Sequence, residues 1–194
     1  MNGIPAWGKR GLSPLFTAWP VPIYTVMLFF IAISVAAPLQ AATRFARATG
    51  TWSAAGTWSN VSCAAVAGGG IPAAGDDVTI CATRTVTLNA NSASLNSLTV
   101  AGTLTIGSNA TGRTLTVAGN ISVSGTMSTG ATAATHSLIA GGDITNTGTI
   151  NLRPTATRVC NVTFNKNGNQ TVSGAGAYTF NRITLNMGAT NANV

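Results

Sequence analysis

Few side chains in this sequence have the chemistry of acids, bases or nucleophiles. Glutamate is absent, and the carboxylate side chains are Asp76, Asp77 and Asp143. Proton transfer at a glycosidic bond needs at least two such groups close together. Asp76 and Asp77 are neighbours that would point to opposite faces of a strand, and Asp143 is separated from them by several predicted strands. We therefore expect no catalytic site and no enzyme activity.

The single histidine and the three cysteines suggest neither a catalytic triad nor a metal site. His136 lies among alanine and threonine residues without a nearby partner, so we expect an ordinary exposed histidine. The cysteines have no CxxC or Cys/His spacing. Cys63 and Cys81 flank a glycine-rich loop, which predicts a disulfide between them and leaves Cys160 alone. Three buried free thiols are the alternative, and we expect no cofactor or bound metal.

The N-terminal segment has the pattern of a secretory signal. Two basic residues precede an uncharged apolar stretch at 21–37, which small and polar residues follow. We predict cleavage after Ala41 or Ala42, so that 1–42 is the signal peptide. An uncleaved anchor is the alternative, although the apolar stretch is short for about 30 Å of hydrocarbon. We expect a secreted or cell-surface protein that meets a membrane through this segment alone.

The charge of the remaining chain does not indicate a nucleic-acid partner. It carries eight basic and three acidic residues, a net charge of +5. The basic residues are scattered singly instead of clustering with aromatic residues, as they do in nucleic-acid-binding proteins. We interpret them as solubilising charges, with weak attraction to acidic polysaccharide or an anionic cell surface as the alternative.

From residue 98 onward the sequence repeats in units of six. The units are LTVAGT (98–103), LTIGSN (104–109), LTVAGN (115–120), ISVSGT (121–126), MSTGAT (127–132), LIAGGD (138–143), ITNTGT (144–149) and INLRPT (150–155). Each begins with an apolar residue, and most have a second one at the third position and glycine at the fourth or fifth. Apolar residues at a period of two predict a strand with one buried face, and the glycine provides freedom for a corner.

These units predict an all-β fold, a parallel β-solenoid over residues 91–194. Three consecutive units would form a triangular coil of about 18 residues, and equivalent units would stack as parallel strands. One rung would consist of Leu115, Ile121 and Met127. An antiparallel β-sandwich is the alternative, because VAGT and VAGN could be hairpin turns.

The predicted coils specify which residues are buried. Leu138, Ile144 and Ile150 would form another rung, with the alanines and Thr-His-Ser before Leu138 as an insertion at a corner. First positions of the units should be buried. Several second positions should be exposed, namely Thr99, Thr105, Thr116 and Ser122. The repeat loosens after residue 155 and stops without a closing element, so we expect further chain beyond Val194.

Three segments before the repeats resemble the start of large secreted bacterial β-repeat surface proteins. They are GTWSAAGTWSN (50–60), GGGIPAAGDDVTI (68–80) and TVTLN (85–89). The resemblance covers roughly 50–186 and is to the filamentous-haemagglutinin-like and autotransporter-adhesin-like β-solenoid group. It implies an N-terminal cap, which we assign to 43–90. The structural positions that it implies are Trp52, Trp58, Pro72, Gly75, Asp76 and Val78; it transfers no binding residue.

The residues of the predicted cap also have a physical interpretation. An open solenoid end exposes strand edges and apolar core, which Trp52 and Trp58 in a turn-rich stretch would cover. A sugar-stacking pair is the alternative for these tryptophans. Asp76 and Asp77 would close a turn, with a calcium site supplied largely by carbonyls as the alternative.

The function that we expect is that of a secreted or cell-surface structural and adhesive protein without catalysis. A glycan-binding module is one alternative, and the expected partners are cell-surface glycans or a host or abiotic surface. Ice binding is another alternative, suggested by hydroxyl side chains at second positions, namely Thr99, Thr105, Thr116, Ser122, Ser128 and Thr145. That column is interrupted by Ile139 and Asn151, ice binding would need a flat array of two threonine columns, and threonine is a good solvent-facing strand former.

Overall fold

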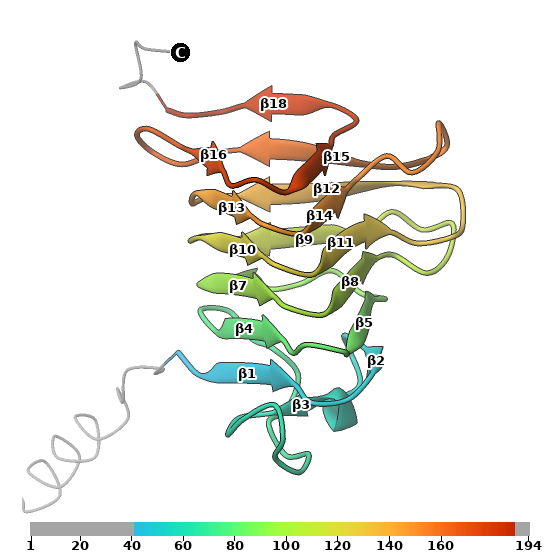
Figure 1. The fold of residues 1–194 in the computed structure, drawn as a ribbon, viewed down its shortest axis with the longest axis vertical. Helices are drawn as coiled ribbons and strands as arrows, with labels where there is room; N and C mark the ends of the chain where they lie inside the picture. The colour runs from blue at the N-terminus through green and yellow to red at the C-terminus, as the bar shows by residue number, and fades with distance from the viewer. Residues whose placement is uncertain (1–40, 189–194) are drawn as a thin grey trace, which may run out of the picture. The chain divides into compact units, whose positions relative to one another are not determined.

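The computed structural model describes residues 41–188, which fold as strands apart from the 3-10 turn η1 (Ala55–Thr57) (Figure 1). Sheet A contains, in spatial order, β16 (Val172–Ser173), β13 (Ile144–Asn146), β10 (Ile121–Val123), β7 (Ser97–Val100), β4 (Asp77–Ile80), β1 (Thr43–Ala46) and β3 (Trp58–Ser59). Sheet B contains β17 (Ala177–Thr179), β14 (Thr149–Asn151), β11 (Thr126–Thr129), β8 (Thr103–Ile106), β5 (Thr85–Leu88) and β2 (Gly50–Thr51). Sheet C contains β18 (Ile183–Leu185), β15 (Arg158–Phe164), β12 (Ala134–Ala140), β9 (Thr114–Val117) and β6 (Ser94–Leu95). Residues 1–40, which make up most of the predicted signal peptide 1–42, and the last residues, 189–194, lie outside the described residues.

From β4 onward the chain visits sheets A, B and C in turn, and each strand pairs in parallel with its equivalent in the next coil. Within residues 41–188 the antiparallel pair is β1 with β3. The fold is therefore the predicted parallel β-solenoid, and the antiparallel sandwich is wrong. The parallel ladders already include β1, β2, β4 and β5, so stacking begins inside the segment 43–90.

The central coils are longer than the predicted one. Leu98 pairs in register with Ile121 and Ile121 with Ile144, a spacing of 23 residues. Between Leu98 and Ile144 the corners that join sheets C to A and A to B are tight, whereas the corner from β8 to β9 spans 107–113 and lengthens the coil. The rungs themselves are as predicted, because Leu138 stacks on Leu115 and Ile150 on Met127.

The stretch before Leu138 differs from the prediction. It is not a corner insertion, because Ala134–Ser137 form the first half of the long strand β12 and pair with β15. Alternation along that strand turns His136 inward on the same face as Leu138. The insertion is confined to the few residues before β12.

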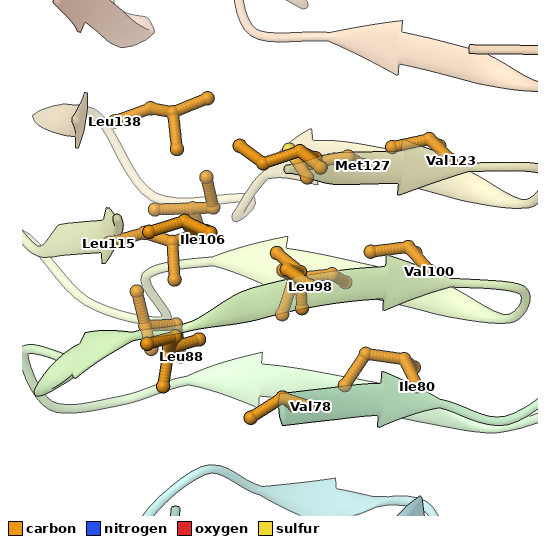
Figure 2. Packing of buried hydrophobic residues seen from close by; sticks show 14 of the residues in the cluster. Val78, Ile80, Leu88, Leu98, Val100, Ile106, Leu115, Val123, Met127 and Leu138 are labelled. Atoms are coloured by element: carbon orange, nitrogen blue, oxygen red, sulfur yellow. The ribbon is translucent and has the colours of Figure 1, made fainter. Parts of the chain in front are cut away.

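Inward-facing aliphatic side chains from all three sheets fill the solenoid (Figure 2). The first positions of the units are buried as predicted; they are Leu98, Leu104, Leu115, Ile121, Leu138, Ile144 and Ile150. Among the second positions, Thr99 and Ser122 are exposed. Thr105 and Thr116 are half-buried. The prediction of exposure was therefore wrong for these two.

The repeated glycine at the fifth position of a unit has a steric cause. Gly102, Gly125 and Gly148 occupy the corner between sheets A and B in successive coils. A Cβ added at Gly125 would overlap the carbonyl oxygen of Gly102, and one at Gly148 would overlap that of Gly125. Backbone therefore stacks on backbone at this corner, which leaves no room for a side chain.

The two ends of the described solenoid differ. At the N-terminal end β3 pairs with β1 and brings Trp58 into the core. At the other end β16, β17 and β18 are the last strands of their sheets. Val172, Ile183 and Leu185 continue the inward columns of that end, yet they remain exposed because no described coil covers them.

Candidate functional site

Asp76 lies directly before β4, and its carboxylate accepts three hydrogen bonds within the chain. Its Oδ2 accepts hydrogen bonds from Arg44 Nε at 3.0 Å and from the backbone N–H of Ala73 at 2.9 Å, and Oδ1 accepts one from the N–H of Ala42 at 3.0 Å. Burial alone would raise the pKa of this carboxyl, but these hydrogen bonds and the Arg44 charge outweigh it and hold the pKa below its usual value. The carboxylate thus stays ionised and fixes the loop before β4 against β1.

The other two carboxylates also bond locally. Asp77 Oδ1 accepts hydrogen bonds from Asn96 Nδ2 at 2.7 Å and from Ser97 Oγ at 2.5 Å. Asp143 Oδ1 accepts from Lys166 Nζ at 2.7 Å and from the N–H of Thr171 at 2.9 Å. The hydrogen bond from Lys166, followed by that from Thr171, lowers the pKa of Asp143.

All three carboxylates lie along one corner, where sheet C passes into sheet A. Asp77 begins β4, and Asp143 precedes β13, three strands further along sheet A. At about 4.8 Å per strand the two are about 14 Å apart. This separation exceeds the roughly 6.5–9.5 Å between the carboxyl groups of an inverting glycosidase. Asp77 and Asp143 therefore do not form a pair of that kind.

Two amide side chains also make contacts between coils: Asn120 lies at the corner between sheets C and A, and Asn146 at the end of β13, where sheet A passes into sheet B. Asn120 Oδ1 accepts a hydrogen bond from the N–H of Asp143 at 2.9 Å, as Asp143 does from Thr171 in the next coil. The buried Asn146 holds the following coil, because its Nδ2 donates to the carbonyl of Ala177 at 2.9 Å. Sequence reasoning missed both, although Asn at an inward third position of ITNTGT is a signal for a buried polar contact.

His136 contradicts the sequence prediction of an exposed side chain. It is 1% exposed, and its Nδ1 accepts a hydrogen bond from the N–H of Arg113 at 3.0 Å. A Cβ at Gly107 would overlap the imidazole, so the histidine fills the space above that glycine. Burial, followed by the nearby Arg113 charge, lowers the pKa of His136, which therefore packs as a neutral ring.

Cys160 pairs in register with His136 on the adjacent strand, but the two do not form a reactive dyad. Burial raises the pKa of the Cys160 thiol to about 12. The thiolate, which is the nucleophile and metal ligand, is thus suppressed. Among the described residues there is no group of three or more His, Cys, Asp or Glu side chains that could hold a metal ion.

The predicted disulfide is confirmed. Cys63 and Cys81 are bonded, with their Cα atoms 5.8 Å apart, and Cys160 is free. The bridge ties the loop after β3 to the end of β4, and so fastens the N-terminal end of the solenoid to its first stacked coils.

The tryptophan pair at that end is buried. Trp52 and Trp58 are 2% and 0% exposed, and their rings meet edge to face at a centroid distance of 5.0 Å. Trp58 Nε1 donates to the carbonyl of Trp52 at 2.8 Å. Pro72 is buried, and Gly75 has φ of 81°, in the left-handed region. This packing fits a cap and leaves no exposed tryptophan platform for a sugar among residues 41–188.

The outer face of sheet B carries hydroxyl side chains in two columns. The first column contains Thr85, Thr103, Thr126 and Thr149. The second contains Thr87, Thr105, Ser128 and Asn151. The second positions of successive units fall on different sheets, so the column of hydroxyl residues predicted from the sequence is distributed over three faces. Ile139, which interrupts the sequence column, belongs to β12 in sheet C.

Comparison with known families decides the classification. The G8 domain family matches residues 57–184, well over half of the chain. The chain belongs to the G8 domain family. G8 is an extracellular domain, which agrees with the disulfide and indicates an extracellular or secreted protein. No curated protein and no solved structure matches the chain.

The G8 match covers strands of all three sheets, from β3 to β18. The narrower resemblance to filamentous-haemagglutinin-like or autotransporter adhesins has no support in this comparison and stays a prediction. The described part of this G8 chain contains no helix with the length and hydrophobicity needed to cross a bilayer.

Proposed function

We propose that this G8 chain is a non-catalytic structural and adhesive module at the cell surface or in secreted form. The observation that carries the proposal is the use of Asp76, Asp77 and Asp143 as local structural acceptors. Each carboxylate stabilises a corner or loop of the solenoid. These carboxylates are thereby engaged in hydrogen bonds within the chain, and Asp143 lies three strands away from Asp76 and Asp77 along sheet A.

The scaffold supports the adhesive part of the proposal. A continuous aliphatic core and parallel ladders give a stiff body, while the outward positions carry hydroxyl, amide and isolated basic side chains. Such a surface forms many weak polar contacts with a glycan or with a host or abiotic surface. The cleavable signal that the sequence predicts would deliver the chain to that location.

The proposal is tested by adhesion of beads that carry the purified protein. Beads with the protein should be retained on cell surfaces or on glass more strongly than beads with an unrelated exported protein. Replacing Asp143 with Asn should leave retention unchanged, because the carboxylate bonds to Lys166 and Thr171 of the same chain. Retention no greater than that of the control beads on every surface would reject the adhesive role.

A further inference from the structure

We propose that the outer face of sheet B binds the ordered water of an ice surface. This face consists of the outward side chains of β5, β8, β11 and β14, which rise side by side in Figure 1. The inference goes beyond the adhesive role and does not depend on it.

The geometry of the face is a two-dimensional lattice. Thr103 and Thr105 lie two residues apart on β8, which separates them by about 6.6 Å along the strand. Thr126 follows Thr103 on the next strand, at about 4.8 Å. The same pair of outward positions recurs in register on β5, β11 and β14. An ice surface also presents oxygen atoms at fixed repeats in two directions, so a regular array can engage many water positions at once.

The hydroxyls of this lattice are available to water. Five hydroxyl side chains of this face make no hydrogen bond to another group of the described residues 41–188. They are those of Thr87, Thr103, Thr105, Thr126 and Ser128. On sheet A, by contrast, the Thr145 and Ser173 hydroxyls approach each other at 3.5 Å. A hydroxyl has one donor and two acceptor sites, so each free side chain can join a water network.

The rigidity of the lattice favours ordered water. Threonine is branched at Cβ and has few side-chain rotamers, and the paired strands on both sides restrict it further. Beneath the face, Val86, Leu104 and Met127 are fully buried and fix the strands. A surface that is already ordered loses little conformational entropy when it binds an ordered partner.

The composition of this face separates it from the other two. None of the outward positions of β5, β8, β11 and β14 carries a charged or aromatic side chain. Sheet A has Asp77 at the corresponding edge, and sheet C has the outward Ile139. Sheet A also carries outward hydroxyl side chains, but in one column, of Thr79, Thr99, Ser122 and Thr145. On sheet C the column that contains Thr116 and Thr163 is interrupted by Ile139. From β5 to β14, sheet B differs in having two columns that no apolar side chain interrupts.

The same composition favours ice over a glycan. Sugars are commonly held by aromatic platforms, and this face has none. Trp52 and Trp58, the strongest candidates for such a platform, are buried at the end of the solenoid. An uncharged hydroxyl lattice therefore fits ordered water better than a polysaccharide.

The test compares two threonines from the same coil and the same position of their units. Thr105→Lys places a long cation in the middle of sheet B, whereas Thr99→Lys places one on sheet A. The purified protein should hold ice growth below the melting point and inhibit ice recrystallisation. Thr105→Lys should lose both activities and Thr99→Lys should keep them, with circular dichroism and thermal unfolding to show that each variant is folded.

Several results would overturn the proposal. They are no ice activity in the unaltered protein, equal loss in both variants, and retention in both. Binding to insoluble polysaccharide that Thr105→Lys removes, without any effect on ice, would show a glycan face instead. If Thr105→Lys does not fold, Thr126→Lys on the neighbouring strand serves in its place, with the same expected loss.

Discussion

Arg44 Nε lies 3.0 Å from Asp76 Oδ2, and this ion pair joins β1 to the loop that precedes β4. The Asp76 side chain is 5% exposed, so the pair is shielded from water. Asp76→Ala would leave the guanidinium and two backbone N–H groups without their acceptor. We expect the free energy of unfolding to fall by about 3–5 kcal/mol, the range for breaking a buried pair.

Urea unfolding measures this change. Thr99→Ala, on the exposed face of sheet A, is the matched control and should change the free energy of unfolding by no more than about 0.5 kcal/mol. An Asp76→Ala protein as stable as the unaltered protein would show that the pair does not hold the cap.

His136 predicts how stability depends on pH. Its folded-state pKa lies below the ordinary value of 6.5 because burial disfavours the charged ring. The unfolded chain therefore takes up the proton first, so stability is full above pH 6.5 and is lost as the pH falls through the folded-state pKa.

Because His136 is the sole histidine, one variant isolates its effect. His136→Gln retains a hydrogen-bond acceptor and removes the titration, so its unfolding free energy should change less between neutral pH and pH values just above the carboxylate range. An equal loss of stability in both proteins over that interval would assign the pH dependence to other groups.

The lowered pKa values of Asp76 and Asp143 predict a second, more acidic transition. Both carboxyls are ionised in the folded state below the ordinary value of 3.8, so their contribution is present above that pH and is lost as the pH falls through the folded-state values. NMR titration of the carboxyl carbons should give midpoints below 3.8 for both residues. Ordinary midpoints would contradict the hydrogen bonds assigned to them.

The cysteines should differ in both stability and reactivity. Cys63→Ser with Cys81→Ser should lower the unfolding free energy by about 2–5 kcal/mol, the usual effect of removing a disulfide from a small secreted domain. Cys160, with its raised pKa, should react with a thiol reagent only when the protein is unfolded. Rapid labelling of one thiol in the folded protein would contradict its burial.

The sequence predicted the repeating strands more fully than it predicted the length of the corners and the contacts between coils. Ile121 and Met127 follow a strand period that local hydrophobicity reveals, and they stack on Ile144 and Ile150 as predicted. The coil length depends on the loop after β8, whose composition carries no strand signal. His136 looked exposed because its neighbours are alanine and threonine, but pairing of β12 with β15 turned it inward.

The candidate functional site was likewise predicted only in part. The sequence identified Asp76, Asp77 and Asp143 as the carboxylates to consider. The spacing of Cys63 and Cys81 predicted their disulfide. Partners such as Lys166 for Asp143 come from the next coil, at a separation of 23 residues that the assumed coil length did not anticipate. The hydroxyl lattice on sheet B was not predicted for a related reason. The second positions of successive units lie on three different faces of the solenoid.

We propose that the carboxylates of this G8 chain serve structure and not catalysis. The most direct test measures the release of reducing ends from a panel of acidic and neutral polysaccharides by the purified protein, from acid to neutral pH. We predict no release above the buffer control, and no difference between the unaltered protein and Asp143→Asn. Release that Asp143→Asn abolishes, while the variant remains folded, would show that Asp143 is catalytic.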